Sequence, residues 1–446
     1  MNILGAGQCG TLLAAMLARH VPRIDLYERG GDPRCGVASA GRSINLALAA
    51  RGVRALEAAQ VMPRVRPLLV PMRGRMVHKL DGSTEFLPYG QRDDEVIFSV
   101  SRGQLNQVLL DAAEEHSNVR VHFRHEVRGF DPASGIARIR DHAGGSDIEV
   151  GGPALIAADG AGSVVRNAYA STGLIGATEA RLQHGYKELT IPAAADGTFQ
   201  LDPGALHIWP RGEFMLIALP NPGGDFTLTL FLPNEGEQSF ATLLTEDAVE
   251  ALFATNFADA AELIPDLCRS LISNPLGLLG TVRCRRWHDG DKLLLIGDAA
   301  HAVVPFHGQG MNLAFEDCVL LEQILGELGP QWQQVFARYE SMQLANANAI
   351  ADMALENYVE MRDTVRDPKF ALQKALSFEL ERRLPDRFIP RYSMVMFHAE
   401  IPYRVAKERG ALQQALLERL TRNAGRLDQI DLDAAAAIVC AELAPI

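Results

Sequence analysis

The N-terminal part of the chain alternates short apolar stretches with one longer stretch rich in Ala and Leu. Residues 2–4 and 24–27 are short and apolar, and the Ala- and Leu-rich residues 11–19 lie between them. This order predicts a strand, a helix and a second strand, as in a β-α-β unit of a buried parallel sheet. A further strand of this type is predicted at residues 154–157. The pattern therefore predicts a parallel sheet covered by helices.

The middle of the chain has a different pattern. Residues 206–210 and 214–219 flank Arg211-Gly212-Glu213, which predicts a β-hairpin. Residues 226–232 alternate apolar side chains with threonine, as a half-buried antiparallel strand does. We therefore expect a separate antiparallel lobe in this region.

The C-terminal part begins with a buried strand and is then helical. Residues 293–296 are short and apolar, and a helical spacing of apolar side chains starts at Gly310. Beyond about residue 325 the pattern stays helical to the end, with polar breaks near residues 366–368 and at Pro385. The parallel-sheet lobe is thus predicted to be discontinuous, interrupted by the antiparallel lobe and followed by a helical one.

Composition and charge exclude several classes of protein. Apolar residues make up 48% of the 446 residues and charged residues 22%, which are ordinary globular values and exclude a disordered chain. The 43 basic and 55 acidic side chains leave a formal charge of −12, which argues against nucleic acid as a partner. No apolar run approaches the roughly 18–20 residues of a membrane span, so we expect a soluble, cytoplasmic protein without a membrane partner.

The cysteines give no sign of disulfides or of a metal site. The six of them are scattered and form no Cys-x-x-Cys pair, which predicts buried free thiols in a reducing cytoplasm and no bound metal. A glycine motif begins directly at residue 5, so we expect no signal peptide.

The turn after the first predicted strand has the spacing of a dinucleotide-binding motif. Gly5, Gly7 and Gly10 give the pattern G-x-G-x-x-G between a strand and a helix. Gly5 allows the tight turn, Gly7 lets a pyrophosphate approach the backbone, and Gly10 lets the helix pack closely on the strand. The N-terminus of the helix would offer free N–H groups to the phosphates. Glu28 follows the second strand, where an acidic side chain can accept hydrogen bonds from a ribose.

Two further motifs follow buried strands. Asp298 comes after residues 293–296, and a loop then leads into the helix that starts at Gly310. Such an aspartate can bond a ribityl hydroxyl or a pyrophosphate-bound water, and the helix N-terminus can stabilise negative charge on a reduced flavin. Asp159 and Gly160 follow the strand at residues 154–157.

Together the three motifs resemble the fingerprint of single-component FAD-dependent aromatic hydroxylases. In that class the Asp159-Gly160 motif would lie near both FAD and the nicotinamide cofactor. No second complete G-x-G-x-x-G is present, which disfavours a dedicated NADPH domain. Longer stretches resemble the kynurenine 3-monooxygenase family over nearly the whole chain: 41–48, 72–78, 99–106, 184–189, 305–317, 356–362 and 389–394.

The resemblance implies a mixed α/β (α+β) fold with three parts. A Rossmann-like FAD-binding domain would be interleaved with a β-sheet substrate domain and followed by a helical domain. The FAD-binding domain would comprise residues 1–70, 97–180 and 285–325. The substrate-side domain would comprise residues 71–96 and 181–284, and the C-terminal helical domain residues 326–446.

The resemblance also implies a reaction in tryptophan catabolism and the kynurenine pathway. Members of the family bind FAD tightly, take a hydride from NADPH, trap O2 as a C4a-hydroperoxyflavin, and hydroxylate L-kynurenine to 3-hydroxykynurenine. The flavin performs the oxygen chemistry, so no side chain is expected to act as acid or base. L-Kynurenine is a zwitterionic amino acid on an aromatic ketone, so its site needs a carboxylate clamp and an apolar slot.

Four residues are candidates for the substrate clamp. Arg75 fits because its planar fork can hold a carboxylate by paired, charge-assisted hydrogen bonds. The resemblance implies that Tyr89 shares this carboxylate, and that Asn357 and Tyr392 contact the substrate from the helical lobe.

A second group of candidates lies beside the flavin. The resemblance places Phe306, His307 and Gln309 in a loop that senses substrate, with Phe306 on the aryl ring and Gln309 on the ketone. His307 is not expected to be a base, because families vary at this position. Glu360 is either a contact of the substrate amine or an ordinary helix charge, and the sequence leaves both readings open.

The cofactor-binding residues follow from the motifs and the resemblance. Arg102 would neutralise pyrophosphate charge, whereas Cys9 and Val127 would act through their backbone. The full set is Gly5, Gly7, Cys9, Gly10, Glu28, Arg29, Ala47, Arg102, Val127, Asp159, Asp298, Gly310, Met311 and Asn312.

Several alternatives remain open at this stage. A sibling hydroxylase of another aryl amine or aryl amino acid would differ only in its pocket. A flavin halogenase would carry a Trp-x-Trp-x-x-Pro stretch, whereas Trp209, Trp287 and Trp332 are far apart in this chain. A non-enzymatic FAD redox sensor would have no reason to keep a carboxylate clamp. The chain is expected to be a monomer or a homodimer.

Overall fold

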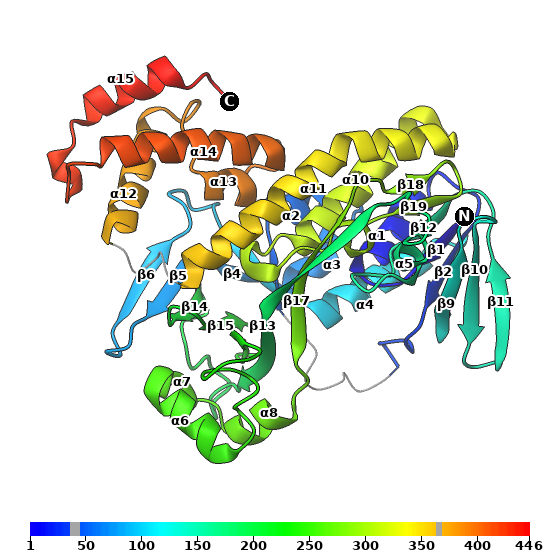
Figure 1. The fold of residues 1–446 in the computed structure, drawn as a ribbon, viewed down its shortest axis with the longest axis horizontal. Helices are drawn as coiled ribbons and strands as arrows, with labels where there is room; N and C mark the ends of the chain where they lie inside the picture. Colours follow the sequence, from blue (N-terminus) through cyan, green and yellow to red (C-terminus); the bar gives the residue numbers. More distant parts are fainter. Residues whose placement is uncertain (36–44, 363–367) are drawn as a thin grey trace.

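The computed structural model describes residues 1–35, 45–362 and 368–446. Three parts are visible in Figure 1: a parallel sheet near the N-terminus, an antiparallel sheet in the middle, and helices toward the C-terminus. The predicted mixed α/β class is confirmed. Residues 41–44 and 366–367, which belong to a quoted motif and a predicted break, lie outside the described residues.

The first sheet is assembled from three distant segments of the chain. Strand β1 lies in its centre, where Ile3 pairs with Leu26 of β2 on one side and Ile156 of β12 on the other. The predicted discontinuity of the parallel sheet is therefore confirmed. The strand order is β18 (His288–Asp289), β19 (Leu293–Leu295), β12 (Leu155–Ala157), β1 (Asn2–Leu4), β2 (Ile24–Glu28) and β8 (Val119–Phe123), with only β18 antiparallel.

Helices cover this sheet and bring its loops together. Helix α1 starts at Gln8, three residues before the predicted start, because Gly7 already serves as its N-cap. Helix α1 packs between α4 and α10, and α10 also packs on α2. The bounds are α1 (Gln8–Leu17), α2 (Ala50–Ala58), α3 (Met62–Val65), α4 (Arg102–Glu114), α5 (Val164–Ala168), α9 (Asp298–His301) and α10 (Gly310–Leu328).

The second large sheet contains the predicted hairpin. Its strands alternate strictly between two faces: Leu216 and Ala218 face a core under α6–α8, whereas Met215, Ile217 and Leu219 face the parallel-sheet lobe. The order is β17 (Gly277–Cys284), β13 (Ala177–Ile191), β16 (Phe226–Pro233), β15 (Met215–Pro220), β14 (Ala205–Pro210), β5 (Gly74–His78) and β6 (Thr84–Pro88). The covering helices are α6 (Glu246–Asn256), α7 (Ala258–Ala261) and α8 (Leu267–Ser273).

Two small sheets complete the β structure. Residues 71 and 72, at the proposed start of the substrate-side domain, belong to β4 and pair with β7, and β5 of the large sheet begins at Gly74. The first small sheet is β3 (Asn45–Leu48), β7 (Ile97–Ser101) and β4 (Val70–Met72). The second is β11 (Ser146–Val150), β10 (Ile136–Asp141) and β9 (His125–Asp131).

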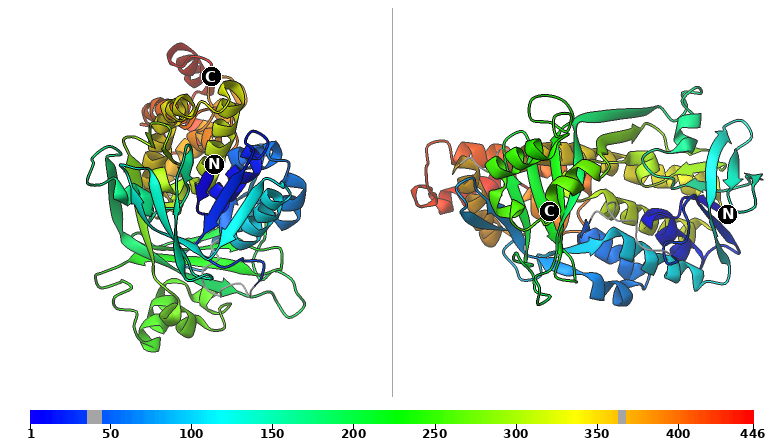
Figure 2. Two further views of the ribbon diagram at one scale, coloured as in Figure 1. Left: turned by 90° about the vertical axis from the view of Figure 1, so that its right-hand side faces the viewer. Right: turned by 90° about the horizontal axis from the view of Figure 1, so that it is seen from below.

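The C-terminal helices lie at the end of the molecule opposite the N-terminus (Figures 1 and 2). The long helix α11 runs from the parallel-sheet lobe toward them and packs on both α10 and α14. No helix in the described part of the chain has the length and apolar character needed to cross a membrane. The bounds are α11 (Trp332–Arg362), α12 (Pro368–Arg383), α13 (Arg391–Met396), α14 (Tyr403–Leu420) and α15 (Leu432–Glu442).

All six cysteines are free, but not all of them are buried. Cys284 and Cys318 are buried, whereas Cys35 and Cys440 are exposed. The prediction of buried thiols is therefore wrong for the last two. Cys35 lies in a loop and Cys440 on α15 at the end of the helical part, where neither packs into a core cluster.

A buried polar network holds β5 against its neighbours. His207 Nε2 donates to the Asp202 carbonyl at 2.9 Å, so its Nδ1 accepts from His78 Nε2 at 2.9 Å. His78 Nδ1 in turn lies 2.7 Å from an Asp259 oxygen, and the Trp209 indole also donates to this carboxylate. Burial lowers the pKa of His207 to about 4. The network fixes the strand that also carries Arg75.

The depressed pKa of His207 predicts a loss of stability on acidification. Below pH ~6.5 the unfolded chain binds a proton at this residue that the folded chain does not, down to about pH 4. Within this range, each pH unit of acidification lowers the free energy of unfolding by about 1.4 kcal/mol. In His207→Gln we therefore expect the drop in thermal midpoint between pH 7.5 and 5.5, followed by calorimetry, to shrink by on the order of 1 °C. An unchanged drop would contradict this.

Candidate functional site

The glycine turn allows two backbone segments to approach closely. Gly5 has φ +100°, and a Cβ at this position would collide with the carbonyl of Ala158. A Cβ at Gly10 would collide with the carbonyl of Gly5. Gly7 differs, because a Cβ there would meet nothing within 4 Å. The first and third glycines are therefore required by packing, and Gly7 alone leaves room for a ligand.

Glu28 braces this turn from the end of β2. One carboxylate oxygen accepts the Ala6 N–H at 3.0 Å and the other accepts the Gly30 N–H at 2.8 Å. The acid that the sequence assigns to a ribose thus also holds the glycine turn in place.

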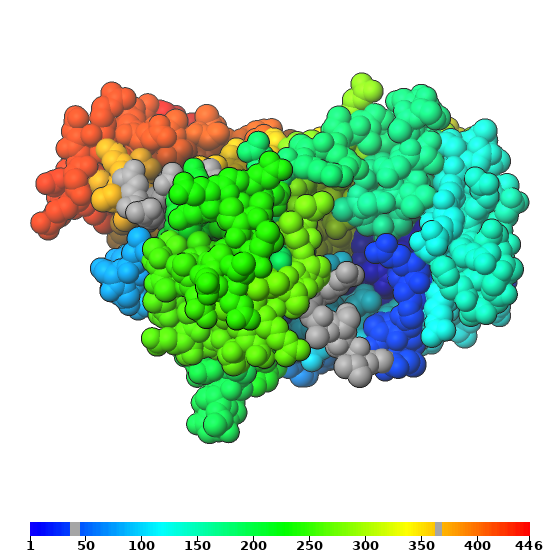
Figure 3. All heavy atoms as spheres, turned by 60° about the horizontal axis from the view of Figure 1, so that its bottom comes forward, coloured from blue at the N-terminus to red at the C-terminus, as the bar shows by residue number. Residues whose placement is uncertain are grey.

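An inner cavity of about 300 Å3 begins at the glycine turn and ends among aromatic side chains. Figure 3 shows the N-terminal segment recessed between the middle lobe and the sheet of β9–β11. Half of the predicted cofactor residues line this cavity: Gly7, Cys9, Ala47, Arg102, Asp298, Gly310 and Met311. Those absent from its lining are Gly5, Gly10, Glu28, Arg29, Val127, Asp159 and Asn312.

The charged groups in this cavity suit a phosphate-bearing, hydroxyl-rich ligand. Burial raises the pKa of Asp298, and the nearby Arg102 opposes that shift. Asp159 lies just outside the cavity lining, next to Gly160, which does line it; one of its oxygens accepts the Val164 N–H at 2.9 Å, and the other has no partner among the described residues. The open space at Gly7, the Arg102 cation and the Asp298 carboxyl group line one cavity, and this set fits FAD, which carries phosphates and hydroxyls.

Asn312 has a structural role that the sequence reasoning missed. Its side-chain oxygen accepts the Ala49 N–H at 2.9 Å, and its amide donates to the carbonyls of Ala47 and Gly308 at 2.8 Å. The side chain is fully buried, so it ties β3 and α2 to the loop before α10. Ala47 and Ala49 lie more than 260 residues away in sequence, and no local pattern could have indicated them.

A partition of four residues closes the far end of the inner cavity: Arg75, Tyr89, His307 and Tyr392. Tyr392 stacks between Tyr89 and His307, with ring centroids 5.4 and 5.5 Å apart. The Arg75 guanidinium lies over both phenol rings, 5.2 Å from Tyr392 and 5.8 Å from Tyr89. Three of the four predicted clamp residues therefore come together, from β5, the loop after β6, and α13.

Burial sets the protonation states in the partition. It raises the pKa of both Tyr89 and Tyr392, so both phenols keep their protons and can donate hydrogen bonds. It lowers the pKa of His307 to about 3, so this imidazole is neutral at physiological pH. The arrangement offers one fixed cation and two neutral donors, which suits a ligand carboxylate.

The remaining predicted substrate residues are divided between the two sides of the partition. Phe306 lines the inner cavity and stacks on Tyr358 with ring centroids 3.9 Å apart. Asn357 lies on the other side, and its amide donates to the Phe306 carbonyl at 2.6 Å. Glu360 also lies on the other side, 3.8 Å from Arg75.

The Gln309 side chain lines neither the inner cavity nor the space on the other side of the partition. The side chain is fully buried, its oxygen accepts the Tyr403 hydroxyl at 2.6 Å, and its amide lies 3.0 Å from the Met396 sulfur. The proposed hydrogen bond to a substrate ketone is thus not available in this arrangement, because both ends of the amide are directed into the core. Contact with a ligand requires rotation of the side chain.

The sequence reasoning also missed the sheet side of the inner cavity. The inward-facing residues of β15 and β16 line it: Met215, Ile217, Leu219, Thr229 and Phe231. The period-two alternation of these strands could have identified this set, because it separates the residues facing the cavity from those facing α6–α8.

The different surroundings of Gly7 and Gly5 predict that alanine at Gly7 weakens FAD binding, whereas alanine at Gly5 lowers stability. Gly7→Ala should leave the thermal midpoint of the apoprotein unchanged and weaken FAD binding at least tenfold, about 1.4 kcal/mol, because its Cβ enters the cavity. Gly5→Ala should lower the apoprotein midpoint, because it combines a positive φ with a backbone collision. Calorimetry and FAD titration test both, and an unchanged FAD affinity in Gly7→Ala would exclude close phosphate approach there.

Comparisons with known proteins agree with this architecture. The family model described as "FAD binding domain" matches residues 1–181 and 272–354. Among solved structures, 2-methyl-3-hydroxypyridine-5-carboxylic acid oxygenase has a TM-score of 0.65 at 17% identity, covering 82% of this chain and 93% of that chain. P. aeruginosa PqsL in complex with 2-aminobenzoylacetate has a TM-score of 0.64 at 20% identity, covering 82% and 97%. These likenesses show the fold.

Curated relatives are much more similar. The kynurenine 3-monooxygenase of Stenotrophomonas maltophilia (strain K279a) is 50% identical, covering 99% of this chain and 97% of the relative. That of Myxococcus xanthus (strain DK1622) is 45% identical, covering 100% and 96%. With an FAD-binding domain, a cavity that begins at its glycine turn, and this identity over nearly the full length, the chain belongs to the kynurenine 3-monooxygenase family of FAD-dependent monooxygenases.

Proposed function

We propose that this chain hydroxylates L-kynurenine to 3-hydroxykynurenine, with FAD as the bound cofactor and NADPH and O2 as co-substrates. The identity to relatives named kynurenine 3-monooxygenase supports the reaction. The observation that carries the proposal is the position of Arg75 with Tyr89 and Tyr392, at the opposite end of the inner cavity from the glycine turn. An amino-acid carboxylate held there leaves the aromatic end pointing toward the flavin side.

The cofactor would supply the redox chemistry. Bound FAD would accept a hydride from NADPH and deliver one oxygen atom of O2 as a hydroxyl group to the ring carbon beside the aryl amine. The second oxygen atom leaves as water, so one NADPH, one proton and one O2 are consumed for each product.

Binding of the amino-acid end falls to the partition. Arg75 would hold the carboxylate by paired hydrogen bonds, and the protonated Tyr89 and Tyr392 would donate to the same group. Glu360 lies 3.8 Å from Arg75 on the outer side of the partition, where it balances the charge of the guanidinium. The carboxylate of the substrate is thereby held by one cation and two hydrogen-bond donors.

The aromatic end is held by shape and by exclusion of water. Phe306, Phe231 and Met215 form an apolar wall against which an aryl ring can pack. His307 is neutral and cannot accept a proton near pH 7, because its pKa is about 3. No base is needed at this point, since the aryl amine itself donates electron density to the ring carbon that reacts.

Anaerobic reduction of the flavin tests the proposed function directly. We expect L-kynurenine to accelerate reduction by NADPH at least tenfold in a stopped-flow measurement, with one 3-hydroxykynurenine formed for each reduced flavin after air is admitted. Fast reduction without L-kynurenine, or hydrogen peroxide as the sole product, would contradict the proposal.

Replacing Arg75 by lysine tests the clamp. Arg75→Lys keeps the charge but removes the planar fork, so L-kynurenine binding should weaken tens-fold, or roughly 2 kcal/mol, while the FAD content stays unchanged. Titration of the flavin absorbance measures both quantities. The control is Arg73→Lys, since Arg73 is exposed, donates to the Asp93 carbonyl at 3.4 Å, and is not among the residues that line either cavity. Loss of FAD from Arg75→Lys would show instead that this residue supports the fold.

A further inference from the structure

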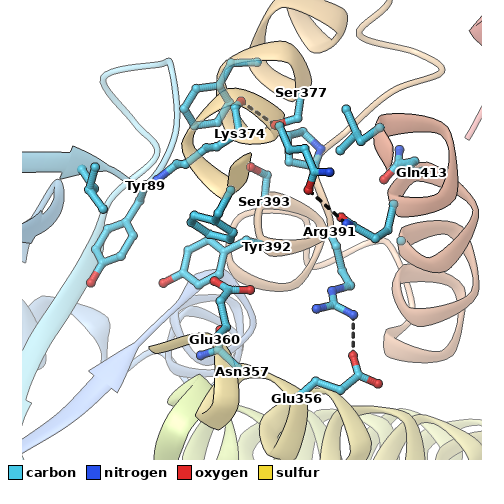
Figure 4. A pocket seen from close by; sticks show the side chains of 18 of the residues that line it. Tyr89, Glu356, Asn357, Glu360, Lys374, Ser377, Arg391, Tyr392, Ser393 and Gln413 are labelled. Carbon is cyan, nitrogen blue, oxygen red and sulfur yellow. Dashed lines mark hydrogen bonds and ion pairs between the residues drawn. The ribbon is translucent and has the colours of Figure 1, made fainter. Parts of the chain in front are cut away.

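A second cavity, the outer chamber, lies directly behind the partition. It has a volume of about 440 Å3 and shares only Arg75, Tyr89, His307 and Tyr392 with the inner cavity. Figure 4 shows its walls, which come mainly from the C-terminal helices. Its wall includes Glu360 of α11, Phe370, Lys374 and Phe378 of α12, Ser393 of α13 and Gln413 of α14.

Two buried polar side chains in the chamber wall lack partners. Gln413 is only 2% exposed, and neither its amide nitrogen nor its oxygen has a hydrogen-bond partner among the described residues. Ser393 is fully buried, and its hydroxyl likewise has no partner among them. Buried amides are almost always hydrogen-bonded, because an unpaired one loses its water without compensation. Gln413 thus presents both a donor and an acceptor to the chamber.

The chamber also contains charges of both signs. The Lys374 ammonium donates to the Pro88 carbonyl at 2.9 Å, which leaves it two further N–H donors. Burial, followed by the charge of Arg75, lowers its pKa to about 8, so the amine remains largely charged at pH 7. Glu360 supplies a carboxylate near both cations. Arg391 and Glu356 pair with one another at 2.5 Å and add no net charge.

The remaining wall is apolar and aromatic. Phe370 and Phe378 lie on α12, and Tyr392 forms part of the partition. The volume lies within the range of small-molecule sites, and aromatic walls with a few polar groups are typical of them. Glu360 and Glu418 line the chamber together with Arg75, Lys369 and Lys374, so it offers partners for a ligand that carries both charges.

We propose that the outer chamber is a second binding site, which takes a zwitterionic aromatic amino acid. Lys374 and the Gln413 amide nitrogen would donate to its carboxylate, and the Gln413 oxygen and Glu360 would accept from its ammonium group. Phe370 and Phe378 would enclose its ring. A ligand in this chamber lies one layer of stacked rings away from the inner cavity, so the two sites can be filled together.

Binding stoichiometry tests this proposal without turnover. The FAD-loaded enzyme is dialysed to equilibrium against radiolabelled L-kynurenine in the absence of NADPH, and the flavin absorbance is titrated in parallel to report on the inner cavity alone. We expect two L-kynurenine molecules per flavin. One molecule per flavin would overturn the proposal.

Two variants assign the second molecule to the chamber. Gln413→Leu and Lys374→Met should each reduce the stoichiometry from two to one, with the flavin titration midpoint unchanged within twofold. The matched controls Gln333→Leu and Lys79→Met lie on the exposed surface and should retain two. The proposal is wrong if both chamber variants still bind two molecules, or if they lose the flavin response together with the second molecule.

The use of L-kynurenine as the probe rests on the proposed function, but the test is separable from it. Dialysis involves no chemistry, so a failure to form 3-hydroxykynurenine would overturn the proposed function and leave the stoichiometry as a measured result. Conversely, normal hydroxylation with one molecule bound per flavin would overturn only the outer site.

Discussion

The close approach of the turn after β1 to the segment after β12 is the constraint on which the rest of the molecule depends. Gly5 fits there because it has no Cβ to collide with the Ala158 carbonyl. Gly10 of α1 fits because it has no Cβ to collide with the Gly5 carbonyl. This contact joins the N-terminus to a strand some 150 residues away in the sequence and sets the start of α1 at Gln8. The space at Gly7, which lines the inner cavity, is open although the glycines on either side of it are tightly packed.

The opposite end of the inner cavity depends on keeping a buried cation. The Arg75 side chain is only 11% exposed, so it has lost most of its contact with water. A buried charge needs compensation, which comes here from the faces of two phenol rings and from Glu360. The chain as a whole carries a charge of −12, yet both ends of the cavity, at Arg102 and Arg75, are cationic. The negative net charge reflects the side chains that face solvent, whereas arginines lie at both ends of the cavity.

Parts of the site could be predicted where the chemistry depends on a residue type at a given spacing. The glycine turn, Asp298 and the Arg75 clamp belong to this group, and the structure brings them to one cavity. Gln309 shows the limit of such reasoning. The family resemblance implies a place for Gln309 near the substrate, but its side chain turns toward Tyr403, which comes almost a hundred residues later. The direction of a side chain is decided by the partners that three-dimensional packing offers.

The sequence by itself determined the β-α-β unit at the N-terminus, the discontinuous parallel sheet with its later strands near residues 155 and 294, and the glycine turn. These features follow from the local periodicity of apolar side chains and from glycines that no other residue can replace. The tertiary structure alone decided that Asn312 would anchor Ala47 and Ala49, and that Tyr392 would stack between Tyr89 and His307. It also decided that a second cavity would form behind that stack. The physical reason is that these contacts join segments far apart in the sequence, whose meeting depends on the packing of the whole chain.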